Sequence, residues 1–228
     1  MNILLVGANG KMAKNVKVVN KKFKHVIFEL DKNTENNMQF KSFFDISNEI
    51  AKKIDVVLDF SSPQVLKSEL NFCEKHKIPL IICSTGQSKA DNTIIKKYSS
   101  LFPIAIVPNT SLGIYLMTKM LKSILKNIKD FDIDLVESHH KLKKDAPSGT
   151  AKMLIKILEN YDVNIHSIRA GEIVGTHEII LTSQYEQLKI SHTAFDKKLF
   201  ALGALNLCQK FQKTISPKLY SIEEILSS

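Results

Sequence analysis

One short segment of the chain gathers side chains that could bind an anion and move a proton. Residues 137–151 read Glu-Ser-His-His-Lys-Leu-Lys-Lys-Asp-Ala-Pro-Ser-Gly-Thr-Ala. Imidazole changes its charge close to neutral pH, so His139 and His140 are candidate proton donors. The ammonium group of Lys143 adds another donor to the same segment. The segment therefore has the side chains that acid–base chemistry on an anionic substrate needs.

The segment ends in a pattern that is typical of a helix start. With Ser148 as the N-cap, Gly149 and Thr150 would present unpaired backbone N–H groups at the positive end of a helix. A carboxylate or a phosphate binds readily at such a position. The alternative is a solvated basic loop, but such loops rarely lead straight into an anion-binding helix start, with Pro147 setting the entry. We therefore expect an anion site here.

A glycine turn near the first residue predicts a dinucleotide-binding unit. The apolar run Asn2–Val6 leads into Gly-Ala-Asn-Gly-Lys-Met-Ala, residues 7–13, after which the pattern becomes helical. In such a unit Gly7 permits the tight turn and Gly10 lets the backbone approach a pyrophosphate. The third small position is Ala13, where glycine is commonest. The candidate cofactor contacts in this turn are Gly7, Ala8, Asn9, Gly10, Lys11 and Met12.

An acidic residue follows the next predicted strand. His25–Leu30 ends in Asp31, about 20 residues beyond the turn, where a carboxylate can accept hydrogen bonds from the adenosine ribose of NAD. The adjacent Lys32 could instead neutralise the 2′-phosphate of NADP. Glu29 could take over the role of Asp31, which could also be a simple turn residue. The carboxylate favours NADH, and both NADH and NADPH remain open.

Three further buried strands also end in polar residues. Ile54–Phe60 is followed by Ser-Ser-Pro, Pro79–Cys83 by Ser-Thr-Gly, and Ile104–Val107 by Pro-Asn-Thr-Ser. Strands that alternate with helices at this spacing predict a doubly wound parallel sheet, and ligands bind at the carboxyl ends of such strands. These polar ends should therefore line one crevice. The further candidate cofactor contacts are Cys83, Ser84, Thr85, Val107, Pro108, Asn109 and Thr110.

The pattern changes after Ser111. A long apolar-periodic helix is predicted first, and a mixed sheet covered on one face follows it. The predicted elements are the helix Leu112–Ile128, the strand Phe131–Val136, the helix Gly149–Leu158, the strands Asn164–Ile168, Thr176–Thr182 and Leu188–His192, and the helix Lys198–Lys213. A capping box, Ser-Ile-Glu-Glu at 221–224, predicts a short last helix.

Several of these motifs resemble those of one enzyme family. Two histidines followed, after Lys143, by Asp-Ala-Pro-Ser-Gly-Thr-Ala at 145–151 are similar to the signature of the bacterial 4-hydroxy-tetrahydrodipicolinate reductases. Residues 59–63, 83–86 and 108–111 resemble the Asp-Phe-Thr/Ser-x-Pro, Gly-Thr-Thr-Gly and Pro-Asn-Phe-Ser-like runs of that family. The chain departs from the family at Thr110, where an aromatic is usual, and at Lys197 and Lys198, near which an arginine is usual.

The resemblance implies a fold and an activity. The fold would be α/β, with a Rossmann-like doubly wound parallel sheet formed by residues 1–110 and 198–228. Residues 111–197 would form an inserted α+β domain for substrate binding and tetramerisation. The enzyme would reduce 4-hydroxy-tetrahydrodipicolinate, a cyclic dicarboxylate, to tetrahydrodipicolinate with loss of water. Hydride would come from NADH or NADPH, in the biosynthesis of diaminopimelate and lysine.

The resemblance also implies roles for single residues. His139 would be the proton donor, and Lys143 a second donor that stabilises charge. The substrate carboxylates would be held by His140, Gly149 and Thr150. Glu137 could orient the loop or be purely structural. The stretches 169–171 and 174–177, which include Arg169 and His177, resemble family motifs and are expected to be scaffold.

Composition narrows the classes of protein. The 228 residues carry a formal charge of +9, yet 169 is the only arginine position, which disfavours a nucleic-acid binder. Apolar runs are far shorter than the ~20 residues of a membrane-spanning helix. Three scattered cysteines, Cys73, Cys83 and Cys208, indicate reduced thiols and no zinc site. We expect a cytoplasmic protein with small molecules, and copies of itself, as its partners.

Two rival functions remain. A catalytically silent NAD(P)-binding sensor would keep the glycine turn, but it would not need an intact segment from His139 to Lys143. A metal-dependent hydrolase could use His139, His140, Asp145 and His177. Adjacent histidines point to opposite faces of an extended chain, and the sequence has no His-x-x-x-His pair on a helix, so we expect no metal site.

Overall fold

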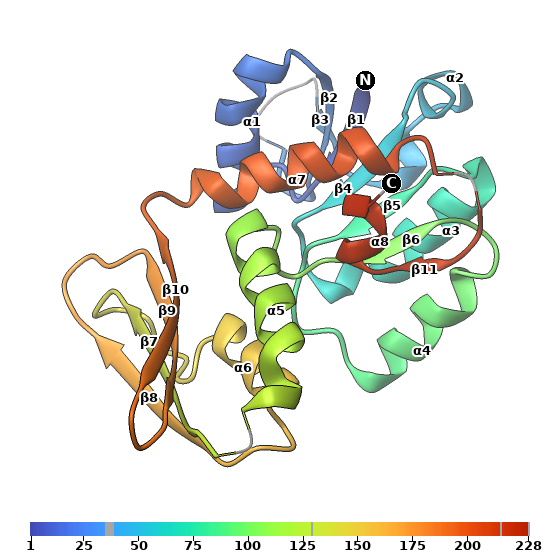
Figure 1. The fold of residues 1–228 in the computed structure, drawn as a ribbon. Coiled ribbons are helices and arrows are strands. Elements are labelled where there is room, and N and C mark those ends of the chain that lie inside the picture. The colour runs from blue at the N-terminus through green and yellow to red at the C-terminus, as the bar shows by residue number, and fades with distance from the viewer. Residues whose placement is uncertain (35–38, 129, 215, 228) are drawn as a thin grey trace. The chain divides into compact units, whose positions relative to one another are not determined.

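The computed structural model describes residues 1–34, 39–128, 130–214 and 216–227. Contacts between Cα atoms divide the chain into two compact units (Figure 1). The first unit joins Met1–Thr110 to Lys198–Ser228, and the second is Ser111–Lys197. Among the helices of the described ranges, none combines the length and the apolar character that crossing a membrane requires.

The described part of the first unit is built on a parallel sheet of seven strands, in the order β11-β6-β5-β4-β1-β2-β3. The central strands are apolar and buried along almost their whole length, as expected for a parallel sheet covered on both faces. The strands are β1 (Asn2–Val6), β2 (Val26–Leu30), β3 (Gln39–Phe40), β4 (Val56–Asp59), β5 (Leu80–Ile82), β6 (Ile104–Ile106) and β11 (Leu219–Tyr220).

Helices cover both faces of this sheet (Figure 1). Ile3 and Leu5 of β1 belong to a core that includes residues of α1, α7 and α8, whereas Leu4 and Val6 face a second core with α3 and α4. The predicted doubly wound sheet is therefore confirmed. The helices are α1 (Lys11–Phe23), α2 (Asn48–Ala51), α3 (Leu66–His76), α4 (Lys89–Tyr98), α7 (Lys198–Phe211) and α8 (Ile222–Ser227), with short 3-10 helices η1 (Phe43–Asp45) and η2 (Pro63–Val65).

Helix α7 returns the chain to the first unit through a close backbone contact. A β-carbon on Gly203 would lie 1.8 Å from the carbonyl oxygen of Thr110, so this approach requires glycine. The Thr110 hydroxyl donates a hydrogen bond of 2.6 Å to the carbonyl oxygen of Phe200, one turn earlier in the helix. These contacts join Thr110, at the end of the first segment of this unit, to α7, the helix that completes the core of the unit.

Residues of the second unit form, where the structure describes them, a mixed sheet of four strands in the order β10-β9-β7-β8. β7 pairs in parallel with β8 and antiparallel with β9, and β9 pairs antiparallel with β10. Helices α5 and α6 supply the apolar side chains that cover one face. The elements are α5 (Leu112–Ile124), η3 (Leu125–Asn127), β7 (Asp132–His139), α6 (Gly149–Ile157), β8 (Val163–Arg169), β9 (Gly175–Thr182) and β10 (Gln187–Ala194).

One strand boundary differs from the prediction in a way that matters for the site. β7 continues to His139, whereas the apolar run had predicted its end at Val136. Side chains alternate along β7, and Glu137 and His139 lie on the same buried face as Leu135. A hydrophobic pattern misses this extension because the last two inward side chains are polar and are paired with each other.

Candidate active site

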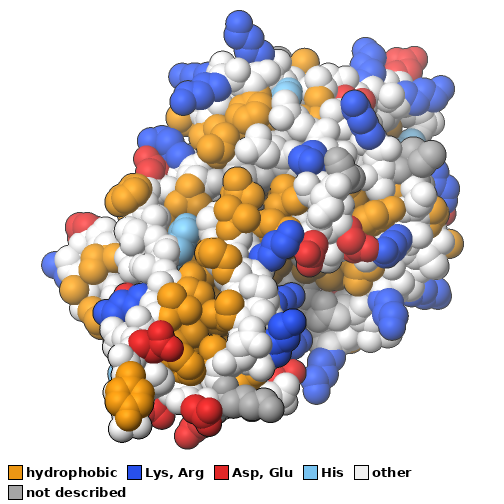
Figure 2. Space-filling view, in the orientation of Figure 1, with side chains coloured by type: hydrophobic (Ala, Val, Ile, Leu, Met, Phe, Trp, Pro, Cys, Tyr) orange, Lys and Arg blue, Asp and Glu red, His pale blue; other side chains and the backbone are white. Residues whose placement is uncertain are grey.

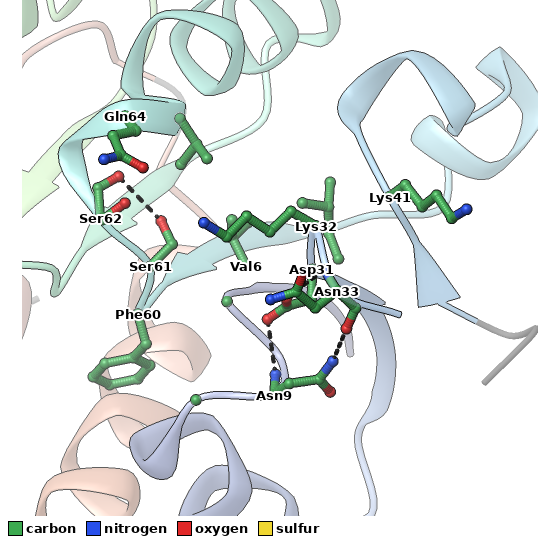
Figure 3. A pocket seen from close by; sticks show the side chains of 14 residues that line it. Val6, Asn9, Asp31, Lys32, Asn33, Lys41, Phe60, Ser61, Ser62 and Gln64 are labelled. Carbon is green, nitrogen blue, oxygen red and sulfur yellow. Dashed lines mark hydrogen bonds between the residues drawn. The ribbon is translucent and has the colours of Figure 1, made fainter. Parts of the chain in front are cut away.

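A cavity of about 380 Å³ opens at the carboxyl ends of β1, β2 and β4 (Figure 3). The turn after β1 forms one wall, the residues after β2 a second, and those after β4 a third. The lining residues are Val6, Gly7, Asn9, Gly10, Leu30, Asp31, Lys32, Asn33, Lys41, Phe60, Ser61, Ser62, Gln64 and Val65. The cavity thus lies where a doubly wound sheet binds its ligands.

The glycine turn brings backbone to the edge of this cavity. Gly7 has a φ of +75°, and a β-carbon there would lie 2.9 Å from the carbonyl oxygen of Phe60. Gly10 is the N-cap of α1, and its N–H donates to the carbonyl oxygen of Gly7 at 2.9 Å. The first turn of α1 carries no acidic residue, which leaves its positive end suited to an anion. This cradle fits the pyrophosphate of a dinucleotide.

Asp31 closes the second wall of the cavity. One carboxylate oxygen accepts a hydrogen bond of 3.0 Å from the backbone N–H of Asn9, and the other accepts one of 3.0 Å from that of Asn33 (Figure 3). Lys32 and Lys41 line the same cavity. A ribose would therefore meet a carboxylate that is already anchored, with ammonium groups nearby.

Glu29, the competing carboxylate, is engaged elsewhere. It forms an ion pair of 3.0 Å with Lys17 and accepts a hydrogen bond of 2.6 Å from the side chain of Gln39. Glu29, which lies in a described range, is not among the residues that line the cavity. The geometry therefore favours Asp31 for the ribose.

The cavity unites only part of the predicted cofactor contacts. Its lining includes Gly7, Asn9, Gly10 and Asp31. It also includes Ser61 and Ser62, from a polar strand end that was expected to line the crevice, and Gln64, which the sequence analysis did not single out. The predicted contacts that the lining does not include, all of them described, are Ala8, Lys11, Met12, Cys83, Ser84, Thr85, Val107, Pro108, Asn109 and Thr110.

Ser84, one of these residues, supports the cavity wall indirectly, through Asp59. The hydroxyl of Ser84 donates to the buried carboxylate of Asp59, which also accepts a hydrogen bond of 2.7 Å from the backbone N–H of Ser61. Burial raises the pKa of Asp59, against the hydrogen bonds from both serines. Cys83 is a buried free cysteine, and burial raises the pKa of its thiol. Ser84 thus helps to fix the loop whose Ser61 faces the cavity.

In the second unit, His139 lies in a compact charged cluster. Its Nδ1 is 2.5 Å from Oε2 of Glu137, and Oε1 of the same carboxylate accepts a hydrogen bond of 2.6 Å from Nη2 of Arg169. The ring of His177 meets that of His139 edge to face, with 5.2 Å between the ring centres. Strand register produces this arrangement, since β7 pairs His139 with Arg169 and Glu137 with His177.

Burial and neighbouring charges shift the pKa values of the three titratable groups in this cluster. Burial lowers the pKa of His139, which Glu137 raises and which Lys143 and Arg169 lower further. Burial also lowers the pKa of His177, to about 4, and the neighbouring His139 adds to that shift. The carboxyl group of Glu137 has a lowered pKa, because its hydrogen bonds from Arg169, Ser167 and His139 outweigh burial, which acts in the opposite direction. The carboxylate of Glu137 therefore faces the imidazole of His139 and is the group that raises its pKa.

The predicted anion site follows directly in the chain. Ser148 is the N-cap of α6, its hydroxyl accepts from the N–H of Ala151 at 3.1 Å, and it lies 3.0 Å from Nε2 of His177. A β-carbon on Gly149 would meet no atom within 4 Å, so space is open beside the helix start. The predicted helix start is confirmed, and it lies next to the histidine cluster.

Lys143 is held in place within the loop between β7 and α6. It forms an ion pair of 2.7 Å with Asp145, whose carbonyl oxygen accepts a hydrogen bond of 2.6 Å from Nη2 of Arg169. His140 is half-buried and follows β7 directly. Arg169 therefore connects the loop with the carboxylate of Glu137.

Sequence reasoning treated Arg169 and His177 as scaffold, and the structure places His177 against His139 and Arg169 against Glu137, the partner of His139. The signal that identifies them is strand register, which a single sequence does not reveal. Atoms of Glu137, His139 and His177 that could bind a metal lie within 4.8 Å of one another. We assign no metal to them, because both carboxylate oxygens are already engaged and Arg169 adds positive charge.

Comparison with known proteins matches both units to one family. The profile described as "Dihydrodipicolinate reductase, N-terminus" covers residues 1–110, and the one described as "Dihydrodipicolinate reductase, C-terminus" covers 113–226. The chain belongs to the dihydrodipicolinate reductase family. It is 36% identical to the 4-hydroxy-tetrahydrodipicolinate reductase of Clostridium tetani, with 100% of this chain and 98% of that protein covered. The Clostridium novyi reductase is 33% identical, with 99% and 98% covered.

Solved structures agree on the fold. The dipicolinate-bound dihydrodipicolinate reductase from Paenisporosarcina sp. TG-14 superposes with a TM-score of 0.83 at 19% identity, covering 99% of each chain. A probable dehydrogenase from Thermotoga maritima gives a TM-score of 0.63 at 11% identity, over 99% of this chain and 92% of that one. The predicted family, the Rossmann-like fold and an oxidoreductase activity are thus confirmed.

Proposed function

We propose that the chain reduces 4-hydroxy-tetrahydrodipicolinate to tetrahydrodipicolinate, with loss of water, in the biosynthesis of diaminopimelate and lysine. The match to reductases of that name over the whole chain is the observation that carries this proposal. The dipicolinate bound to the structural relative is itself a cyclic dicarboxylate, which supports a small dicarboxylate as substrate. One hydride and one proton are added in the reaction, and one water molecule leaves.

NADH or NADPH supplies the hydride when it is bound. On this chain, Gly7 and Gly10 would hold the pyrophosphate, and Asp31 the ribose, at the cavity of the first unit. Ser61 and Ser62 would add hydroxyl contacts from the wall after β4. The predicted cofactor contacts that do not line this cavity would bind the remainder of the cofactor.

The substrate would bind in the second unit. The open start of α6, with Gly149 and Thr150, would receive one carboxylate, and His140 would help to hold it. Hydride addition leaves electrons on the ring, so a proton must arrive from a placed acid. His139 would deliver it, while Lys143 would stabilise the developing charge and act as the second donor.

Purified protein is expected to oxidise NADH or NADPH when it is given the condensation product of pyruvate and aspartate semialdehyde. The absorbance of the reduced nicotinamide reports the rate. Parallel reactions with each cofactor measure the preference, and the anchored Asp31 carboxylate leads us to expect higher kcat/KM with NADH. Reactions without the substrate serve as the control. Cofactor binding without turnover would instead indicate the sensor.

We further propose a cytoplasmic homotetramer that forms through the sheets of the second unit. The two edge strands support this, because β8 exposes Ile165 and Ile168 and β10 exposes Leu188. Light scattering is expected to give a mass four times that of the chain. A monomer at working concentration would refute it.

Figure 2 shows Lys and Arg side chains scattered over the visible face rather than gathered in one patch. This distribution is consistent with a small-molecule enzyme rather than a nucleic-acid binder.

A further inference from the structure

The carboxylate of Glu137 is completely buried, and both of its oxygens are engaged. Oε2 lies 2.5 Å from Nδ1 of His139, and Oε1 accepts from Nη2 of Arg169 at 2.6 Å. A charged group in such a place is costly unless every partner is present. This cost indicates that the pair with His139 serves a purpose other than packing.

Arg169 extends this arrangement to the loop. Its Nη2 donates both to Glu137 and to the carbonyl oxygen of Asp145, at 2.6 Å in each case. The side chain of Asp145 holds Lys143 at 2.7 Å. One guanidinium group therefore connects the carboxylate behind His139 with the loop that carries the second proton donor.

We infer that Glu137 is the positioning residue for His139, and that Arg169 fixes the Lys143 loop to the same carboxylate. The inference rests on the proposed function, in which His139 gives a proton to the substrate. A carboxylate that faces Nδ1 fixes a hydrogen on that nitrogen, and the proton that is transferred is then the one on Nε2.

The absence of a side chain at residue 175 leaves room beside Nε2 of His139. A β-carbon on residue 175 would lie 3.0 Å from Nε2 of His139, and that residue is Gly175. Protonated His139 gives its Nε2 proton to the substrate and is left as a neutral imidazole whose Nδ1 hydrogen faces Glu137, and it takes up a proton from solvent after product leaves. No bond other than those to the proton is made or broken at His139.

The groups that face His139 set its proton affinity. Glu137 raises the pKa of the imidazole, whereas burial and the charges of Lys143 and Arg169 lower it. The neutral ring of His177 occupies the remaining side. Glu137 is thus the one group among them that favours the protonated acid. Without its charge, His139 should lose its proton at a lower pH.

Glu137→Gln is expected to lower kcat at neutral pH by about 10- to 100-fold, within the range of a weakened acid–base group. Activity depends on protonated His139, so it falls as pH rises through the pKa of that group. In the variant this fall should move to lower pH, so the loss should shrink in acid. KM for the cofactor should not change. The measurement is kcat against pH for the purified, full-length enzyme.

Two variants separate this role from a structural one. Glu137→Asp keeps the charge, so its pH profile should stay with that of the wild type even where kcat is lower. Asp134→Asn is the matched control. Asp134 lies on the opposite face of β7 from Glu137 and also binds a histidine, His166, at 2.8 Å. Its replacement should change neither kcat nor the pH profile. Thermal unfolding checks that each variant is folded.

Arg169→Lys gives a second, independent measurement. It keeps a positive charge near Glu137 but cannot donate to two acceptors from one fixed planar group. We expect a higher KM for the substrate, because the loop that carries Lys143 is no longer fixed to Arg169. The pH profile of His139 should be retained, because the carboxylate of Glu137 is still present.

A loss in Glu137→Gln that is equal at every pH, or no loss, would overturn the inference, as would wild-type KM in Arg169→Lys. The proposed function fails differently, since the wild-type enzyme itself would then show no turnover. If Glu137→Gln does not fold, the inference is decided by Glu137→Asp and Arg169→Lys: a shifted profile in the first, or an unchanged KM in the second, refutes it.

Discussion

Replacing His139 with glutamine is expected to lower kcat by about two to four orders of magnitude, the usual scale for a lost acid–base group. Glutamine has a similar size and can bond to Glu137, but it cannot release a proton at neutral pH. Steady-state kinetics with saturating substrate measure the loss. Replacing Lys143 should lower kcat on the same scale, because the second donor is lost.

Cofactor binding should survive in both variants, because the glycine turn and Asp31 lie in the other unit. Titration with reduced nicotinamide measures this directly. His166→Gln is the matched control, since His166 also binds a carboxylate, Asp134 at 2.8 Å, but lies away from His139. Turnover at the wild-type rate in His139→Gln would reject the proposed role of this residue.

Gly203→Ala is expected to destabilise the first unit by about 3 kcal/mol or more. Alanine normally stabilises a helix interior relative to glycine, by about 1 kcal/mol. Here its β-carbon would lie 1.8 Å from the carbonyl oxygen of Thr110, so α7 must shift away and overpacking dominates. Urea unfolding of the two proteins measures the difference in free energy.

Gly149→Ala is the matched control for stability, because a β-carbon at the start of α6 meets nothing within 4 Å. Its free energy of unfolding should stay within about 1 kcal/mol of the wild type. Equal stability of Gly203→Ala and the wild type would show that α7 does not need this close approach.

Most of the sheet in the first unit could be predicted from sequence. β1, β4 and β5 are short apolar runs bounded by glycine, proline or serine, so local composition alone identifies them. β3 and β11 have two residues each and were not predicted. Such strands exist because a neighbouring strand offers free backbone groups, which is a property of the fold and not of two residues.

The residues proposed to react could be named from the sequence, whereas the residues that support them could not. His139 and Ser148 stand out by residue type and by the helix start that follows. Arg169 and His177 are far along the chain, and only the pairing of β8 and β9 with β7 brings them to His139. The choice between Glu29 and Asp31 likewise required the hydrogen bonds of each carboxylate.

The return of α7 to the first unit has a consequence for the newly made chain. Residues 1–110 leave the ribosome long before Lys198–Phe211, which cover β4 and pack on α1. The apolar side chains of α7, among them Leu205 and Phe211, are therefore missing from this core during most of translation. The continuous segment Ser111–Lys197 emerges complete before them. The unit formed by this inserted segment can thus mature first, while the unit begun before it must wait.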